Sequence, residues 1–289
     1  MRHINYTFII PHHNSPKLLN RCLDSIPQRD DIQIIVVDDN SDGDKKPTIN
    51  RRSEVEYIFI DENETKGAGR ARNKGLQKAK GRWLLFADAD DYYNEGFIRI
   101  LDKYVNSNLD ILFFNVSSND SGINNRALHI QNKYNSFLSD KVSIDIIKYT
   151  LWIPWNKMFS SAFIKLNGIQ FDEIPVGNDA FFSLKASDNA TNIKVIDDCL
   201  YCVTYNEQSL TYSKMSFEKE MNYLTINLRI NDFLLTKGLN ENIIVLLSFR
   251  RLFSLLYKYG LRNLYNYLLV IYKSGQLKRQ IKLCLCFKK

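Results

Sequence analysis

Runs of apolar residues alternate with amphipathic segments through the first hundred residues of the chain. The apolar runs have the length of buried strands and occupy residues 6–10, 33–37, 55–60 and 83–87. Apolar positions at helical spacing fall between them, over 17–26 and 69–80. Strands that are apolar throughout imply a sheet covered on both faces. The pattern therefore predicts an α/β fold, in which a mixed, mostly parallel sheet carries helices on both faces.

The pattern changes twice farther along the chain. A strand is expected at 111–116, then a polar stretch rich in Asn and Ser, a helix near 141–149 and another at 180–186. Segment 152–157 holds two tryptophans and a proline and is not expected to be helical. Long helical runs are predicted at 217–236, 240–259 and 261–272. We therefore place a domain boundary near Met215, followed by a helical C-terminal extension over 216–289.

Polar residues follow three of the predicted strands at the point where each strand ends. They are Pro11-His12-His13-Asn14, Asp38-Asp39-Asn40-Ser41 and Asp88-Ala89-Asp90-Asp91. Ligands of open α/β sheets bind beyond the carboxyl ends of the strands, so the three clusters are expected to share one cleft. Three carboxylates within four positions repel one another unless a cation or hydrogen bonds offset their charge. Taken alone, the last cluster leaves a divalent metal site and an acidic turn equally open.

Several spaced motifs resemble those of the inverting glycosyltransferases of family 2, nucleotide-sugar enzymes with the GT-A fold that often act in bacterial polysaccharide synthesis. Over residues 5–100 these are Ile9-Ile10-Pro11-x-x-Asn14, Val36-Val37-Asp38-Asp39-x-Ser41, Gly69-x-Ala71-Arg72-Asn73-x-Gly75 and Leu85-Phe86-x-Asp88-Ala89-Asp90-Asp91. Trp155-Asn156-Lys157 and Asn178-Asp179-x-x-Phe182 resemble the acceptor-side pattern of the family. The resemblance implies a GT-A catalytic domain over 1–215, with a nucleotide-sugar half at about 1–105 and an acceptor half at about 106–215.

The resemblance also implies roles for particular residues, with a UDP-sugar as the expected donor. Asp39 would hold the nucleotide base, Asp88 the ribose, and Asp90 a divalent metal, Mn²⁺ or Mg²⁺, bound to the diphosphate. The remaining donor contacts would come from Pro11, His13, Asn14, Arg72 and Ala89. Asp179 is the candidate base for the acceptor hydroxyl, although Asn178 stands where the family has Glu. Glu173 is the alternative candidate for the base.

Other interpretations stay open for these residues and for the whole chain. Asp38 and Asp39 could cap a turn, Asp179 could cap the helix that follows it, and the tryptophans could be core aromatics or sugar-stacking residues. A sugar-1-phosphate nucleotidyltransferase uses a similar sheet and metal, but no glycine-rich activating loop stands near the start of this chain. A catalytically inactive glycan-binding or scaffold protein of the same fold is the second alternative.

The charge of the chain is unevenly distributed. The net charge of +7 arises because ten Lys or Arg and no acid follow position 242, whereas residues 1–242 carry 29 basic and 32 acidic side chains. This basic, Tyr-rich tail favours an anionic membrane surface, and charges interrupt its apolar runs too often for a spanning helix. No nucleic-acid-binding fold is evident. With no secretory signal at the N-terminus, we expect a cytoplasmic enzyme that is peripheral to the inner face of the membrane. The expected acceptor is a glycan, either lipid-linked or free.

Overall fold

The computed structural model describes residues 3–49, 52–61, 67–120, 122, 125–205, 214–239 and 243–286. The chain divides into two compact units, residues 1–208 and 209–289, and each unit has an apolar core of its own.

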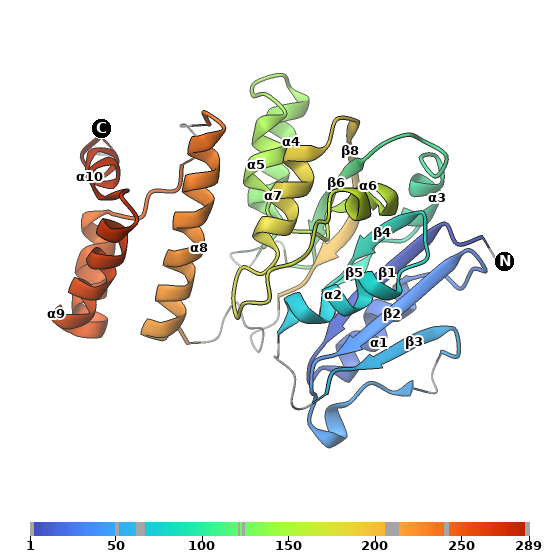
Figure 1. Cartoon of the computed structure of the whole chain (residues 1–289). Coiled ribbons are helices and arrows are strands. Elements are labelled where there is room, and N and C mark those ends of the chain that lie inside the picture. The colour runs from blue at the N-terminus through green and yellow to red at the C-terminus, as the bar shows by residue number, and fades with distance from the viewer. Residues whose placement is uncertain are drawn as a thin grey trace. The chain divides into compact units, whose positions relative to one another are not determined.

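The first unit is built on a mixed sheet (Figure 1). Its strands are β1 (Tyr6–His12), β2 (Ile32–Asp38), β3 (Val55–Phe59), β4 (Trp83–Phe86), β5 (Tyr92–Tyr93), β6 (Ile111–Ser118), β7 (Lys157–Ser160) and β8 (Ile193–Val203). Within the described residues they lie in the order β3-β2-β1-β4-β7-β6-β8-β5. The pairs among β1 to β4 are parallel, as predicted, whereas β7 runs antiparallel to both β4 and β6. The carboxyl ends of β1, β2 and β4 therefore meet at one edge.

Helices α1 (Pro16–Ser25) and α2 (Ala68–Lys78) cover opposite faces of this sheet. Successive strand residues point to opposite faces, and β2 shows the alternation directly. Ile34 and Val36 pack into the core that holds Leu19 of α1, whereas Ile35 and Val37 pack with Ala71 of α2. The apolar run in β2 is thus explained by burial on both sides, as the sequence predicts.

The remaining helices of the first unit pack along the β6 and β8 half of the sheet (Figure 1). They are α3 (Phe97–Asp102), α4 (Leu128–Leu138), α5 (Asp145–Thr150), α6 (Ser161–Leu166) and α7 (Ala180–Asn189). The expectation of only a polar stretch before residue 141 is wrong, because α4 forms there. Ile130 and Tyr134 stand one turn apart and are fully buried, and the Tyr134 hydroxyl donates to the Phe114 carbonyl at 2.8 Å.

The second unit consists of α8 (Phe217–Thr236), α9 (Phe249–Lys273) and α10 (Leu277–Cys286). The prediction of a helix over 240–259 is wrong in its first half: residues 243–248 are not helical, and 240–242 lie outside the described residues. The backbone of Ile244 bonds both ways with the Asn231 side chain, and the Leu246 N–H donates to Gln280 Oε1 at 2.7 Å. These side chains satisfy backbone groups that a helix would have paired internally.

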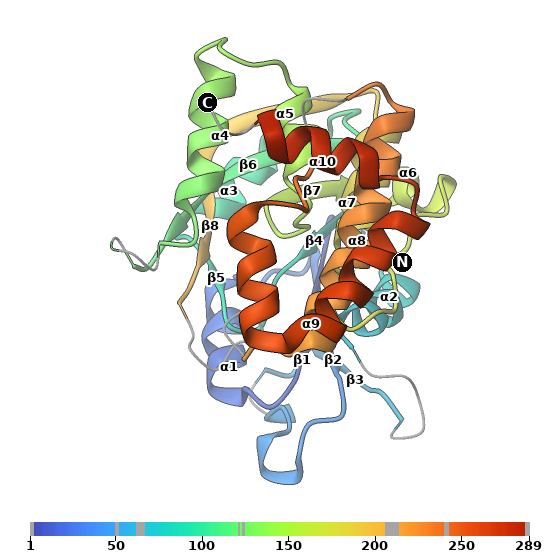
Figure 2. The same cartoon turned by 90° about the vertical axis from the view of Figure 1, so that its left-hand side faces the viewer.

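The long helix α9 begins where the Ser248 hydroxyl accepts a hydrogen bond from the Arg251 N–H at 3.1 Å. It bends at Gly260, whose φ of 79° is open to glycine at little cost (Figure 2). Among the described helices, none combines the length and the apolarity that crossing a bilayer requires.

Candidate functional site

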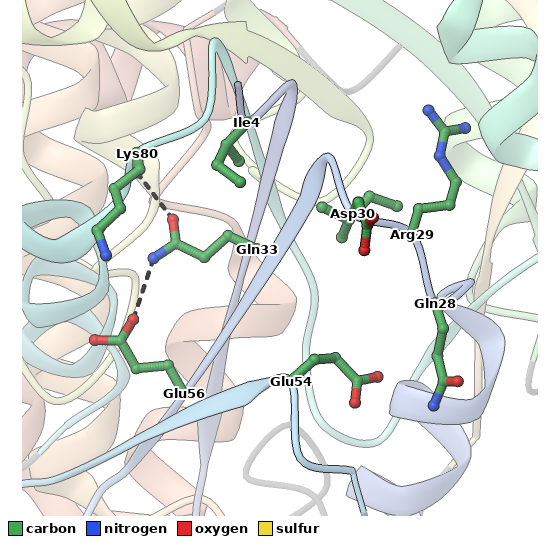
Figure 3. Close-up of a pocket in the computed structure, with 9 residues that line it drawn as sticks. Ile4, Gln28, Arg29, Asp30, Gln33, Glu54, Glu56 and Lys80 are labelled. Atoms are coloured by element: carbon green, nitrogen blue, oxygen red, sulfur yellow. Dashed lines mark hydrogen bonds between the residues drawn. The ribbon is translucent and has the colours of Figure 1, made fainter. Parts of the chain in front are cut away.

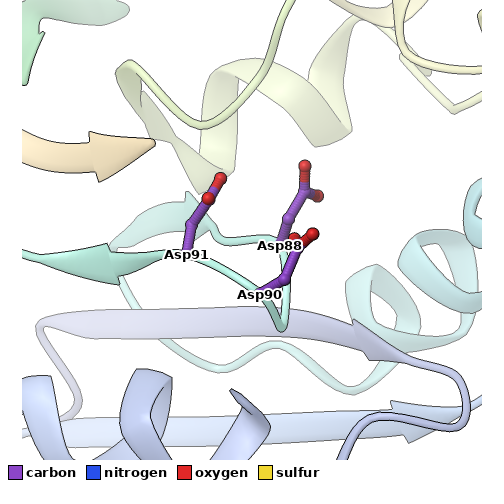
Figure 4. A group of neighbouring side chains, drawn as sticks. All are labelled: Asp88, Asp90 and Asp91. Atoms are coloured by element: carbon purple, nitrogen blue, oxygen red, sulfur yellow. The ribbon is translucent and has the colours of Figure 1, made fainter. Parts of the chain in front are cut away.

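The acidic turn after β4 brings three carboxylates together (Figure 4). Oxygen atoms of Asp88, Asp90 and Asp91 all lie within 4.8 Å of one another. The Asp91 N–H donates to the Asp88 carbonyl at 3.0 Å, which closes the turn. Asp88 and Asp90 are partly exposed, whereas Asp91 is buried. Two carboxylates of the cluster are thus accessible to a ligand, and the third is held inside.

Asp91, to which the sequence gives no role, anchors the acidic turn to the end of β8. Its carboxylate accepts the Thr204 N–H at 2.7 Å and the Tyr201 hydroxyl at 3.1 Å. The same hydroxyl accepts the Asp88 N–H at 2.9 Å, so Tyr201 touches both ends of the turn. Burial and the neighbouring charges of Asp90 and Asp88 raise the pKa of Asp91 well above its ordinary value.

Arg72 connects the acidic turn to the segment before α7. Its Nη2 lies 2.7 Å from Asp88 Oδ1, and its Nη1 donates to Asn178 Oδ1 at 2.9 Å. The guanidinium is buried and lies over the Phe171 ring, with its Cζ 5.4 Å from the ring centroid. A planar, permanently charged fork suits this position because it can bind two acceptors at fixed angles.

Asp39 lies at the end of β2, and only one of its two carboxylate oxygens accepts a hydrogen bond from the described residues. Gly67, just before α2, donates its N–H to Asp39 Oδ2 at 2.8 Å. Asp39 Oδ1 is buried and has no hydrogen-bond partner among the described residues. Because a buried acceptor without a partner is costly, this oxygen is suited to a donor group on a ligand.

The loop after β1 lines the same edge of the sheet. The His13 Nδ1 lies 2.8 Å from the Asp39 carbonyl, and Asn14 Nδ2 lies 3.1 Å from His13 Nε2. A neutral His13 with its proton on Nδ1 satisfies both contacts. Asn14 also accepts the Asp42 N–H at 2.8 Å, so it ties this loop to the one after β2. Pro11 is partly buried beside them in β1.

Asp38 caps the turn after β2, as the turn interpretation predicts. It accepts the Ser41 N–H at 3.1 Å and the Ser41 hydroxyl at 2.6 Å, and it lies 2.7 Å from His12 Nδ1. Burial acts to raise the pKa of Asp38, but the hydrogen bonds from His12 and Ser41 outweigh it and hold the pKa below its ordinary value. His12 is occupied within this buried group.

Asp179 lies at the N-cap position of α7, yet its side chain makes no capping hydrogen bond. Burial raises the pKa of Asp179, with a further upward contribution from Asp88, while Arg72 and Lys157 oppose the shift. A half-buried carboxylate that has a raised pKa and makes no capping hydrogen bond is suited to accept a proton. The reserve candidate, Glu173, is exposed and already pairs with Arg70 at 3.0 Å.

The acidic turn fits a hard divalent cation. Its donors are carboxylate oxygens, which Mg²⁺ and Mn²⁺ prefer, and two of the three carboxylates are partly exposed. Arg72 neutralises part of the charge on Asp88.

Sequence reasoning missed Tyr201 and left two interpretations of the tryptophans. Trp155 is buried and stacks on Tyr201, with ring centroids 5.2 Å apart, so it is a core aromatic. Lys157 is fully buried, and its ammonium donates to the carbonyls of Leu151 and Ile153, which shapes the 151–156 segment. Tyr201 in the strand-like run Leu200-Tyr201-Cys202-Val203 was the available signal, but nothing in that run indicates a contact with Asp91.

A hollow of about 430 Å³ lies at the opposite edge of the sheet, where the strands begin (Figure 3). Ile4 and Ile32 line it, together with charged side chains that include Arg29, Glu56 and Lys80. There the Gln33 side chain donates to the Glu56 carboxylate at 3.2 Å and accepts a hydrogen bond from the Lys80 backbone N–H at 2.9 Å. This hollow is distinct from the acidic turn, which lies at the carboxyl ends of the strands.

Comparison with known proteins agrees with this geometry. The family model described as Glycosyl transferase family 2 matches residues 7–166, more than half of the chain. The chain belongs to this family. The matched region contains the ends of β1, β2 and β4, helix α2 and the acidic turn.

Two relatives come from Staphylococcus aureus and Bacillus subtilis. The poly(ribitol-phosphate) β-N-acetylglucosaminyltransferase TarS of Staphylococcus aureus is 27% identical over 207 residues, which is 68% of this chain and 35% of TarS. The uncharacterized glycosyltransferase EpsJ of Bacillus subtilis is 27% identical over 227 residues, 71% of this chain and 62% of EpsJ. The chain therefore spans only about a third of TarS and under two thirds of EpsJ.

The fold is that of solved family members. The crystal structure of S. aureus TarS residues 1–349 in complex with UDP-GlcNAc matches with a TM-score of 0.70 and 21% identity, covering 95% of this chain and 81% of that one. The GT-A fold predicted from the motifs is confirmed by this likeness. Whether the individual residues act as the motifs imply stays a prediction.

Proposed function

We propose that this chain is an inverting glycosyltransferase that moves a sugar from a UDP-sugar to a hydroxyl of a glycan acceptor. One observation carries the proposal: contacts from Asp39 through Gly67 into α2, and from Arg72 to Asp88 and Asn178, join the ends of β2 and β4 to the segment that holds Asp179. Base, diphosphate and acceptor groups thereby fall in one continuous site. The solved UDP-GlcNAc complex of TarS supports a uridine nucleotide as the donor class.

The donor would be held mainly by groups that the structure leaves open to a ligand. Asp39 Oδ1 would accept a hydrogen bond from the nucleotide base, with Pro11 and His13 beside it. Asp88, partly exposed, would accept from the ribose, with the Ala89 backbone adjacent to it. Asn14 acts by holding the two loops together, and Arg72 supplies positive charge near the diphosphate.

Asp90, with Asp88, would hold a divalent cation, Mn²⁺ or Mg²⁺, at the diphosphate. When bound, the cation stabilises the negative charge that develops on the departing nucleoside diphosphate. The protein contributes the fixed geometry of the turn, because Tyr201 and Thr204 hold Asp91 from behind.

Asp179 would remove the proton from the acceptor hydroxyl. The hydroxyl oxygen forms a bond to the anomeric carbon as the bond from that carbon to the diphosphate oxygen breaks. The electron pair leaves with UDP, the proton passes to Asp179, and attack from the opposite side inverts the configuration. A hydroxyl is a weak nucleophile until its proton is being removed, so the raised pKa of Asp179 is useful here.

The acceptor would be a glycan in bacterial surface polysaccharide synthesis, carried on a lipid. A Campylobacter jejuni relative, 29% identical over 179 residues, is named as a glucosyltransferase acting on an undecaprenol-diphosphate-linked glycan and covers 60% of this chain. The acid-free basic tail supports a place at the inner face of the membrane. Neither alternative, the nucleotidyltransferase nor the inactive scaffold, gains support from a specific contact.

Release of UDP from a panel of UDP-sugars, with and without Mn²⁺, tests the proposal on the full chain. We expect one or a few donors to give UDP in a metal-dependent manner and to raise the melting temperature. Asp90→Asn and Asp39→Asn should each lose donor turnover, whereas Asp140→Asn, an exposed acid with a left-handed backbone that Asn tolerates, should not. Metal-independent turnover, or an active Asp90→Asn variant, would contradict the assigned metal site.

A further inference from the structure

Helix α9 carries exposed apolar side chains spaced four residues apart on each of its two arms, which meet at the non-helical Gly260. Phe249, Phe253, Tyr257, Leu261 and Tyr265 are 58%, 71%, 85%, 73% and 62% exposed. Residues four apart lie on the same side of a helix, so Phe249, Phe253 and Tyr257 form one strip before Gly260, and Leu261 and Tyr265 form a second strip after it. Scattered apolar residues are ordinary on protein surfaces, but two such strips in one element indicate an interaction surface. We refer to the two strips together as the exposed row.

The other side of α9 is occupied, so the exposed row is not a core left unfilled. Leu255, Tyr267 and Ile271 are buried and pack with Leu224 and Leu228 of α8. Arg251 forms an ion pair with Glu220 of α8 at 2.6 Å. The helix is therefore held within the second unit through one side, which leaves the side with the apolar row available to a partner.

Cations surround the exposed row, and acids are absent from it. Arg250, Lys258, Arg262 and Lys273 of α9 are exposed, and no Asp or Glu occurs anywhere from residue 243 onward. Helix α10 continues the pattern with exposed Ile281 beside exposed Lys278 and Lys282. We call the exposed apolar row of α9 and its cations the α9 face.

We propose that the α9 face binds the surface of an anionic lipid bilayer. Phe253, Tyr257 and Leu261 would enter the boundary between headgroups and acyl chains, and Arg250, Lys258 and Arg262 would pair with lipid phosphates. Tyrosine suits that boundary because its ring is apolar and its hydroxyl stays hydrated. No helix needs to span the bilayer for this mode of binding.

Charge decides between a bilayer and a second copy of this chain as the occupant. Two α9 faces brought together would place their cations against one another with no acid on the face to offset them. An anionic bilayer instead offers negative charge and an apolar layer in the same place. The inference rests on the proposed function for its biological role, because membrane binding would concentrate the enzyme where lipid-linked acceptors reside.

Co-sedimentation of the full chain with vesicles tests the inference. Vesicles of phosphatidylcholine alone are compared with vesicles containing phosphatidylglycerol. We expect binding to the anionic vesicles, weakened by salt. Lys258→Gln and Arg262→Gln should weaken it about fivefold for each charge removed. Phe253→Gln, Tyr257→Gln and Leu261→Gln combined should weaken it on the order of 100-fold.

A matched control replaces exposed apolar residues of the first unit. Leu128, Leu138 and Leu166 are 53%, 44% and 87% exposed, and changing all three to Gln should leave vesicle binding unaltered. UDP release with a soluble acceptor should persist in every variant, so failure of vesicle binding and failure of the proposed catalysis are separate results. Circular dichroism establishes that each variant is folded.

Two outcomes would overturn the inference. One is a folded α9 triple variant that binds anionic vesicles as tightly as the wild type. The other is a wild-type chain that does not bind vesicles but forms dimers in sedimentation velocity, while the triple variant stays monomeric. The α9 face would then be a contact between two copies of the chain.

Discussion

The Arg72 guanidinium donates a hydrogen bond to the Asn178 amide oxygen at 2.9 Å. The motif has Glu where this chain has Asn178, and a neutral amide changes how the charge of Arg72 is shared. Asp88 is its carboxylate partner at 2.7 Å, and Asn178 adds an acceptor without a second negative charge. The positive charge of Arg72 is therefore less neutralised by its neighbours than it would be between two carboxylates, which favours an anionic ligand beside it.

Arg72→Lys should impair use of the donor. A lysine ammonium cannot reproduce the planar fork that reaches Asp88 and Asn178 at once. We expect kcat/KM for the UDP-sugar to fall about 10- to 100-fold, which corresponds to losing one charged hydrogen bond. Arg70→Lys is the matched control, because Arg70 pairs with the exposed Glu173 and should tolerate the change. Equal effects of the two variants would argue against a special role for the Arg72 fork.

Asp91→Ala should destabilise the first unit. It would remove the acceptor for the buried Thr204 N–H and leave the Tyr201 hydroxyl without its carboxylate. We expect a loss of about 2 kcal/mol in the free energy of unfolding, measured by urea denaturation. Asp91→Asn retains an acceptor for Thr204 and removes a charge that Asp90 and Asp88 repel, so its stability should stay near that of the wild type. If both variants lose the same amount, the charge itself is what the fold requires.

The sequence predicted the part of the fold that rests on local pattern. Strands β1, β2 and β4 are apolar runs with both faces buried, so their parallel pairing followed from the apolar pattern. Helix α4 was missed because its only fully buried positions are Ile130 and Tyr134, and because Leu128 and Leu138 are exposed, so its apolar residues do not mark one buried face. The helical run before Phe249 was wrong because Asn231 and Gln280, distant in sequence, bind its backbone.

The candidate site divides in a similar way. Asp39, Asp88 and Asp90 could be picked from sequence because each follows a strand at the edge where ligands bind. Tyr201 could not, since its contact with Asp91 spans 110 positions and depends on how β8 pairs with β5 and β6. The engagement of Glu173 by Arg70 is also a matter of tertiary structure, and it is what separates Glu173 from Asp179.

Gly69→Ala should disturb both stability and activity. A Cβ at Gly69 would lie 2.1 Å from the Asp172 carbonyl oxygen, so α2 would have to move away from that segment. We expect a cost of about 1 to 3 kcal/mol in the free energy of unfolding. Because α2 carries Arg72, donor kcat/KM should fall as well. Gly43→Ala is the control, since nothing lies within 4 Å of its added Cβ; a harmless Gly69→Ala would contradict the close packing of α2.

The rate of transfer should depend on pH through Asp179. The base acts in its deprotonated form, and a raised pKa means that activity is lost as pH falls at a higher pH than for an ordinary aspartate of about 4. Asp179→Asn should lower kcat on the order of 100- to 10,000-fold and abolish this acid limb. Glu173→Gln should keep both the rate and the limb, because Glu173 is an exposed ion-pair partner of Arg70. A kcat profile over the pH range in which circular dichroism shows a folded protein distinguishes the two carboxylates: an acid limb that disappears with Glu173→Gln and persists in Asp179→Asn would transfer the role of base to Glu173.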